Sequence, residues 1–225
     1  MFILSISLAI LSVVRKRRRY DAIFARTPFT TAFLSHEWGA DLANRNHFRV
    51  KGFDEKLKQW TISTWFDSDR LTRDVMTEIT AGIDKTKIVL LFLTKRYMEK
   101  VVGTAIPRDI EYCHIEFHSA IRRRGRDHIL VIIMEPDLLD KTTWFGPVAD
   151  TLRSALCIDF STNAKLDSAV ARAASEIDKM CESFGYLPAD NGENLPLATV
   201  AEDQTEKPVV ISPSAAYPSL GARNI

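Results

Sequence analysis

Two uninterrupted apolar runs constrain the fold of this chain more than any other feature. Residues 88–93 read Ile-Val-Leu-Leu-Phe-Leu, and residues 129–134 read Ile-Leu-Val-Ile-Ile-Met. A strand with one face in water alternates apolar and polar side chains, whereas a strand covered on both faces is apolar throughout. Both runs are therefore predicted to be central strands of a parallel sheet that carries helices on its two faces.

The chain after Pro28 alternates between short β-rich runs and longer helical patterns. Such alternation predicts an α/β fold, and right-handed crossovers give a flavodoxin-like three-layer sandwich with a five-stranded parallel sheet in the order 2-1-3-4-5. Apolar residues recur at spacings of three and four in the last helical segment, which predicts an amphipathic closing helix. Strands are predicted at residues 29–35, 61–66, 87–93, 128–134 and 155–160, and helices at 48–59, 75–83, 108–123 and 163–184.

Composition excludes several classes of protein. The 225 residues are 46% hydrophobic and 26% charged, which is enough apolar material for one ordinary core. The net charge of +1 excludes the broad positive field of a nucleic-acid binder. Cys113, Cys157 and Cys181 are an odd number at wide spacing, so neither a disulfide framework nor a zinc site is expected. A reducing compartment, no metal and no nucleic-acid partner are predicted.

Both ends of the chain are expected to lie outside the folded domain at residues 29–185. Residues 1–14 are apolar apart from serines and would span about 21 Å as a helix, short of the roughly 30 Å hydrocarbon core. A basic cluster at 15–19 would hold the rest of the chain in the cytoplasm, so residues 1–28 are either an anchor, with membrane association through 1–19, or an irregular start. Residues 187–225 lack apolar periodicity and are predicted to be a disordered tail.

Four motifs, in this order, resemble those of Toll/interleukin-1 receptor (TIR) domains. Residues 33–38 read Phe-Leu-Ser-His-Glu-Trp, and residues 64–71 read Thr-Trp-Phe-Asp-Ser-Asp-Arg-Leu. Residues 93–97 read Leu-Thr-Lys-Arg-Tyr, and residues 112–117 read Tyr-Cys-His-Ile-Glu-Phe. The set resembles a TIR domain across residues 29–185 and is most similar to the TIR proteins of single-celled eukaryotes.

One departure and two rejected alternatives accompany this resemblance. The BB loop of TIR domains usually carries a glycine where residues 71–74 read Leu-Thr-Arg-Asp, so the loop lacks that freedom for positive φ. A response-regulator receiver needs an acidic pair after strand one and an aspartate after strand three, where this chain has Ser35-His36 and Thr94. A flavodoxin needs a glycine- and hydroxyl-rich phosphate loop, which residues 36–46 do not provide.

The resemblance implies two alternative functions. Some TIR domains cleave the bond between nicotinamide and ribose in NAD, which is a substrate and not a prosthetic group, and Glu116 matches their catalytic glutamate. Other TIR domains are noncatalytic adaptors that signal through TIR–TIR contacts with themselves and with other TIR proteins. Both alternatives imply self-association of a cytoplasmic protein.

The predicted helix suggests how the chemistry would be arranged. Tyr112 and Glu116 lie four residues apart, so they would share a helix face and look into the crevice. One carboxylate suffices because nicotinamide leaves as a neutral molecule, and Glu116 would stabilise the oxocarbenium-like ribose. Tyr112 and Trp38 are candidates for ring stacking, and Ser35, His36 and Arg70 for ribose and phosphate contacts. Simpler interpretations stay open: Glu116 could be an ordinary solvated helix carboxylate, and Trp38 could serve only in packing.

Overall fold

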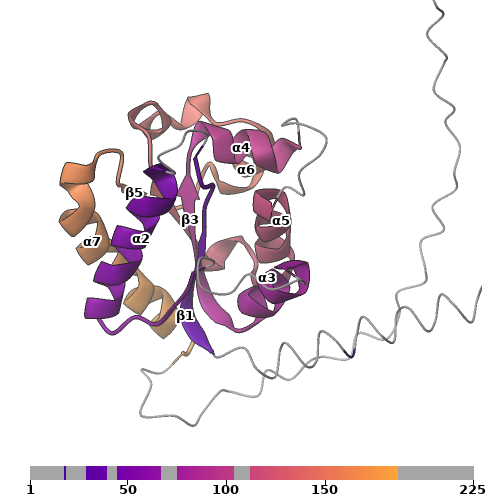
Figure 1. The fold of residues 1–225 in the computed structure, drawn as a ribbon, viewed down its shortest axis with the longest axis vertical. Helices are drawn as coiled ribbons and strands as arrows, with labels where there is room; N and C mark the ends of the chain where they lie inside the picture. Colours follow the sequence, from indigo (N-terminus) through magenta and orange to yellow (C-terminus); the bar gives the residue numbers. More distant parts are fainter. Residues whose placement is uncertain (1–17, 19–28, 40–44, 67–74, 104–111, 187–225) are drawn as a thin grey trace, which may run out of the picture. The chain divides into compact units, whose positions relative to one another are not determined.

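The computed structural model of the chain describes residues 18, 29–39, 45–66, 75–103 and 112–186 (Figure 1). Strands and helices alternate along these ranges, and short 3-10 helices (η) occupy several connections. The elements in chain order are β1 (Thr30–Ser35), α2 (Arg45–Gln59), β2 (Thr64–Trp65), α3 (Val75–Asp84), β3 (Thr86–Leu93), α4 (Lys95–Val102), α5 (Tyr112–Arg124), η2 (Arg126–His128), β4 (Ile129–Ile133), η3 (Pro136–Leu139), η4 (Lys141–Thr143), α6 (Gly146–Leu152), β5 (Cys157–Asp159), η5 (Asn163–Lys165) and α7 (Leu166–Ser183).

The five strands form one sheet in the order β2-β1-β3-β4-β5, and every neighbouring pair is parallel. Ser35, the last residue of β1, pairs in register with Leu91 of β3. The strand order reverses between β1 and β3, so side chains that follow these two strands meet at a switch point. The predicted flavodoxin-like topology is confirmed.

Helices cover both faces of the sheet and divide the core in two. Figure 1 shows α2 and α7 on one face and α3, α4, α5 and α6 on the other. Successive side chains of β3 alternate between the two apolar clusters: Val89 and Leu91 pack toward α3–α6, whereas Leu90 and Phe92 pack toward α2 and α7. Every residue from 88 to 93 is buried, which explains why this run contains no polar residue.

Two helices were not expected from the sequence. Helix α4 begins after Thr94, whose hydroxyl accepts the Tyr97 N–H, and it ends at Gly103 with φ 78°. It buries only Tyr97, Met98 and Val101, and α6 is one residue shorter still. Segments of seven or eight residues span two turns, too few for a helical period to stand out.

The second strand is shorter than the predicted range 61–66. Thr61 adopts φ 60°, and its N–H bonds to the Lys58 carbonyl, so the last turn of α2 extends to this position. Only Thr64 and Trp65 then pair with β1. A β-branched residue is rare at positive φ, and the β propensity of Thr61 therefore misled the sequence prediction.

Asp159 ends β5 and organises the turn into α7. Its carboxylate accepts hydrogen bonds from Lys165 Nζ at 2.5 Å and from the Ser161 N–H and hydroxyl at 3.0 and 2.7 Å. Burial raises the pKa of Asp159, but these hydrogen bonds outweigh it and lower the pKa to about 2. The carboxylate is therefore ionised at neutral pH.

The expectations for residues 1–28 and 187–225 concern the two ends of the chain, which, apart from Arg18, lie outside the described residues. Among the helices that the structure describes, none is both long and apolar enough to cross a membrane.

Candidate functional site

Three buried polar side chains meet at the carboxyl edge of β1 and β3. Ser35 is the last residue of β1, Tyr97 lies in the first turn of α4 directly after β3, and Glu116 lies in the second turn of α5. Their exposed fractions are 1%, 0% and 4%. Residues far apart in sequence thus converge at the switch point, where open α/β sheets bind their ligands.

The hydrogen bonds among these three side chains have a fixed direction. Ser35 Oγ donates to Glu116 Oε2 at 2.7 Å, and the Tyr97 hydroxyl lies 2.7 Å from the same Ser35 Oγ. Serine carries a single hydroxyl proton, so Tyr97 must be the donor toward Ser35. A directed chain from Tyr97 through Ser35 ends on the carboxylate and holds its orientation.

The environment of Tyr97 keeps this donor protonated. Burial raises the pKa of the Tyr97 hydroxyl well above its usual value, and nearby Cys113 and Glu116 raise it further. The hydrogen bond with Ser35 lowers the pKa by a smaller amount. Tyr97 therefore keeps its proton at neutral pH and can act as the donor to Ser35.

Helix α5 presents Glu116 from its buried face, most of which is apolar. Cys113, Phe117 and Ala120 pack into the core beneath the helix, as predicted for these positions. Glu116 is buried beside them, so the carboxylate does not line an open crevice. Tyr112, the first residue of the helix, is 42% exposed, and the two side chains that were expected to face the crevice together differ sharply in burial.

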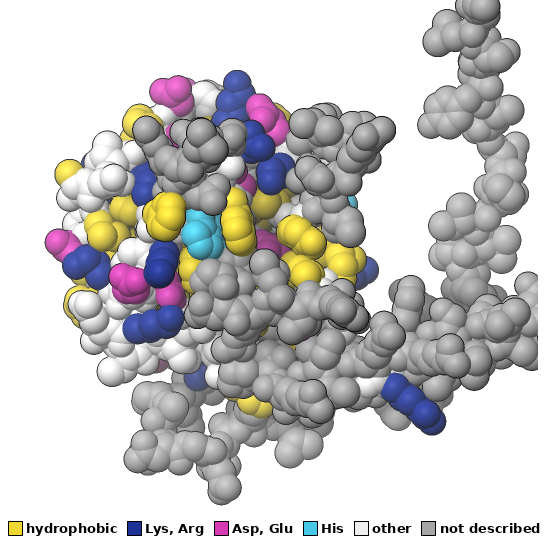
Figure 2. All heavy atoms as spheres, in the orientation of Figure 1, with side chains coloured by type: hydrophobic (Ala, Val, Ile, Leu, Met, Phe, Trp, Pro, Cys, Tyr) yellow, Lys and Arg dark blue, Asp and Glu magenta, His cyan; other side chains and the backbone are white. Residues whose placement is uncertain are grey.

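His36 and Trp38 belong to an aromatic cluster next to this site. His36 is 4% exposed, its Nε2 lies 3.0 Å from His47 Nδ1, and its ring stacks on Phe66. Trp38 is 39% exposed and its ring centroid lies 4.6 Å from that of His47. Figure 2 shows hydrophobic side chains gathered around a histidine on the drawn face. The His36 ring packs against His47 of α2 and Phe66, while the Trp38 ring is partly exposed to solvent.

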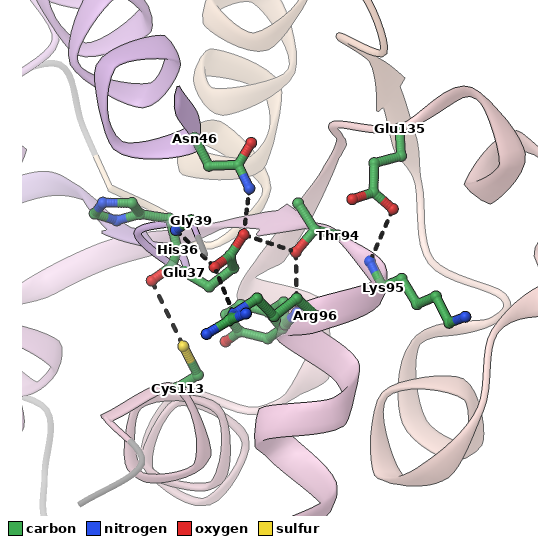
Figure 3. Close-up of polar contacts among 10 residues, drawn as sticks. His36, Glu37, Gly39, Asn46, Thr94, Lys95, Arg96, Cys113 and Glu135 are labelled. Carbon is green, nitrogen blue, oxygen red and sulfur yellow. Dashed lines mark hydrogen bonds and ion pairs between the residues drawn. The ribbon is translucent and has the colours of Figure 1, made fainter. Parts of the chain in front are cut away.

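Glu37 is a second buried carboxylate that sequence reasoning did not single out. It is 2% exposed and accepts hydrogen bonds from the Gly39 N–H at 2.7 Å, the Asn46 side-chain amide and the Thr94 hydroxyl at 3.4 Å (Figure 3). Arg96 Nε lies 3.5 Å from Glu37 Oε2. Its place two residues after the end of β1, at the switch point, was the available signal.

The first turn of α4 connects the two carboxylates. The Thr94 hydroxyl donates to Glu37 and accepts the Tyr97 N–H at 2.9 Å, so Thr94 caps α4 while it contacts the network. Glu135, which lies just after β4, accepts the Lys95 N–H at 3.0 Å (Figure 3). Carboxylates near a helix N-terminus are favourable because the unpaired N–H groups carry partial positive charge.

The site residues predicted from the sequence are only partly assembled by these contacts. The structure joins Ser35 to Glu116 directly, and it joins His36 to Trp38 through His47. Arg70 lies outside the described residues, as do the other residues of the 67–74 loop. Tyr97, Glu37 and His47 are additional polar groups at the same edge of the sheet.

A family model for the TIR domain matches residues 33–174, which is more than half of the chain. A comparison with curated proteins found no match. The matched segment begins in β1, ends in α7 and contains Ser35, Tyr97 and Glu116. Together with the parallel sheet in the order β2-β1-β3-β4-β5, this match shows that the chain belongs to the TIR domain family of signalling proteins.

Proposed function

We propose that this TIR domain cleaves the bond between nicotinamide and ribose in NAD, with Glu116 as the catalytic carboxylate. The observation that carries the proposal is the burial of Glu116 at the carboxyl ends of β1 and β3, where Ser35 holds it. Ligands of open α/β sheets bind at this position. A buried carboxylate is costly unless hydrogen bonds or an opposite charge offset its loss of hydration. Buried titratable groups of this kind concentrate at functional sites.

The chemistry requires little beyond one negative charge. Nicotinamide in NAD is a pyridinium, so it departs with the bonding electron pair as a neutral molecule and needs no proton. Positive charge then develops on the ribose ring, and a preoriented carboxylate in a dry site stabilises that charge. Water adds to the same ribose carbon and loses its proton to solvent, which yields ADP-ribose.

Burial also predicts how the activity is controlled. Glu116 is only 4% exposed, so NAD contacts it only after neighbouring side chains have moved. TIR domains generally act through TIR–TIR interactions, and association of two copies would supply the free energy for that movement. Dilute protein should therefore release little nicotinamide, and activity per molecule should rise with protein concentration.

The decisive experiment replaces Glu116 by glutamine. Glutamine keeps an oxygen that accepts the Ser35 hydroxyl proton and keeps the side-chain volume, but it removes the charge. Nicotinamide release by concentrated full-length protein should fall about 10²–10³-fold. Glu55→Gln, an exposed change on α2, is the matched control and should be silent. Equal release by the wild type and Glu116→Gln would refute the catalytic assignment.

The noncatalytic adaptor is the second candidate, and one observation favours it. The hydrogen bonds through Ser35 tie α5 to β1 and α4, which is a structural role for Glu116 that needs no substrate. If concentrated wild-type protein self-associates and releases no nicotinamide, the adaptor function replaces the enzymatic one.

A further inference from the structure

Two histidines on α5 lie outside the site described so far. His114 and His118 are four residues apart, and both are exposed. Their ring centroids are 4.3 Å apart with an interplanar angle of 54°. Side chains at this spacing are neighbours on a helix surface, so the two imidazole rings lie side by side.

One contact fixes which nitrogen of His114 carries the proton. His114 Nδ1 lies 2.7 Å from the Val101 carbonyl oxygen, and a carbonyl only accepts, so Nδ1 donates. Val101 belongs to the last turn of α4, whose carbonyls have no partner within the helix. In the neutral ring the lone pair is therefore on Nε2. Histidines that bind metals almost always donate their other nitrogen to a carbonyl or carboxylate in this way.

The second histidine is also suited to donate a lone pair. Burial lowers the pKa of His118, and the nearby His114 and Arg122 lower it further. Arg122 opposes a bound cation, but its side chain is exposed and its field is screened by solvent and salt.

We propose that His114 and His118 form a surface binding site for a divalent transition-metal ion of the zinc class. Imidazole suits Zn²⁺, Ni²⁺ and Cu²⁺, and Zn²⁺ accepts two histidines with other ligands in its remaining positions. No group of three or more His, Cys, Asp or Glu side chains is placed to hold a metal within the part of the chain that the structure describes. The two histidines leave the remaining coordination positions of the ion open to water or to other ligands.

The site has a consequence for the neighbouring carboxylate. A metal that bridges positions 114 and 118 ties together one turn of α5, and Glu116 lies within that turn. Because the folded helix holds both imidazoles in place, it binds the metal more tightly than the unfolded chain does, and stability rises with metal concentration. The proposal does not depend on any catalytic activity of Glu116.

Titration of the full-length protein with ZnCl₂, followed by calorimetry, tests the proposal. The wild type should bind Zn²⁺ saturably and melt at a higher temperature in its presence. His118→Ala should weaken binding at least about tenfold. His114→Asn removes Nε2 but keeps an N–H near the Val101 carbonyl, so it should weaken binding equally while the chain stays folded.

Free thiols are the main competing ligands and supply the control. Cys157 and Cys181 are partly exposed, and neither lies on α5. The double variant Cys157→Ser/Cys181→Ser should bind Zn²⁺ as the wild type does. Absence of saturable binding to the wild type, or unchanged affinity in His118→Ala, would overturn the proposal.

Discussion

Replacing Ser35 by alanine tests the chain of hydrogen bonds at the centre of the site. The change removes one hydroxyl that accepts the Tyr97 proton and donates to Glu116, at 2.7 Å in each case. The Tyr97 hydroxyl is fully buried and loses this acceptor. The carboxylate loses a charge-assisted hydrogen bond, while the volume lost is a single oxygen atom.

The expected loss of stability comes from these two groups. A hydrogen bond to a charged group contributes about 1.5–3 kcal/mol, and a buried polar group left without its partner costs about 1–3 kcal/mol. The terms overlap, so we expect the free energy of unfolding to fall by about 2–3 kcal/mol. For a domain of this size that lowers the melting temperature by about 4–12 °C.

A double-mutant cycle with Tyr97→Phe separates this hydrogen-bond chain from general packing. Tyr97→Phe removes the donor that Ser35→Ala leaves unsatisfied, so the double variant should lose about 0.5–3 kcal/mol less than the sum of the single variants. Ser183→Ala removes an exposed hydroxyl that bonds to the Met180 carbonyl at 2.9 Å, and it should change stability by under about 0.5 kcal/mol. The reasoning would be refuted if Ser35→Ala were as stable as the wild type, or if the effects of the two single substitutions added up in the double variant.

Three further changes test other parts of the structure by urea unfolding. Gly82→Ala would place a Cβ 2.8 Å from the buried Trp65 ring and should lower the free energy of unfolding by about 1–2 kcal/mol net. Gly52→Ala meets no atom within 4 Å and should stabilise α2 by about 1 kcal/mol. Equal urea midpoints for the two variants would contradict this. The pKa of Asp159 is lowered to about 2, so its contribution to stability is complete above about pH 4 and is lost as the pH falls toward 2. The difference in the free energy of unfolding between the wild type and Asp159→Asn should therefore shrink over that window. A difference that stays constant with pH would argue against it. Glu37→Gln turns an amide toward hydrogen-bond donors and should lower the free energy of unfolding by about 1–3 kcal/mol. An unchanged melting temperature would contradict this.

The fold could be predicted because its strongest signals are local. A run such as 88–93 is apolar at every position only when both faces are covered, and two such runs fixed the centre of the sheet. Helices α4 and α6 left no comparable signal because each buries only three residues. Helix α4 depends instead on the Thr94 cap and on Gly103, features that are also common in isolated turns.

The site could be predicted less completely, because its contacts join distant segments. Ser35 lies 62 residues from Tyr97 and 81 from Glu116, so no local period indicates that their side chains touch. Helical spacing grouped Tyr112 with Glu116 on one face, but it carried no information about what covers that face. The structure buries Glu116 against β1 and leaves Tyr112, at the start of the helix, exposed.

The first turn of α4 is the physical link between the two buried carboxylates. Thr94 caps the helix and contacts Glu37, while Tyr97, three residues later, begins the hydrogen-bond chain to Glu116. A shift of this turn must therefore alter both carboxylates, since each depends on a donor that the turn positions. Helix α4, which sequence periodicity could not reveal, is therefore the element that couples Glu37 to Glu116.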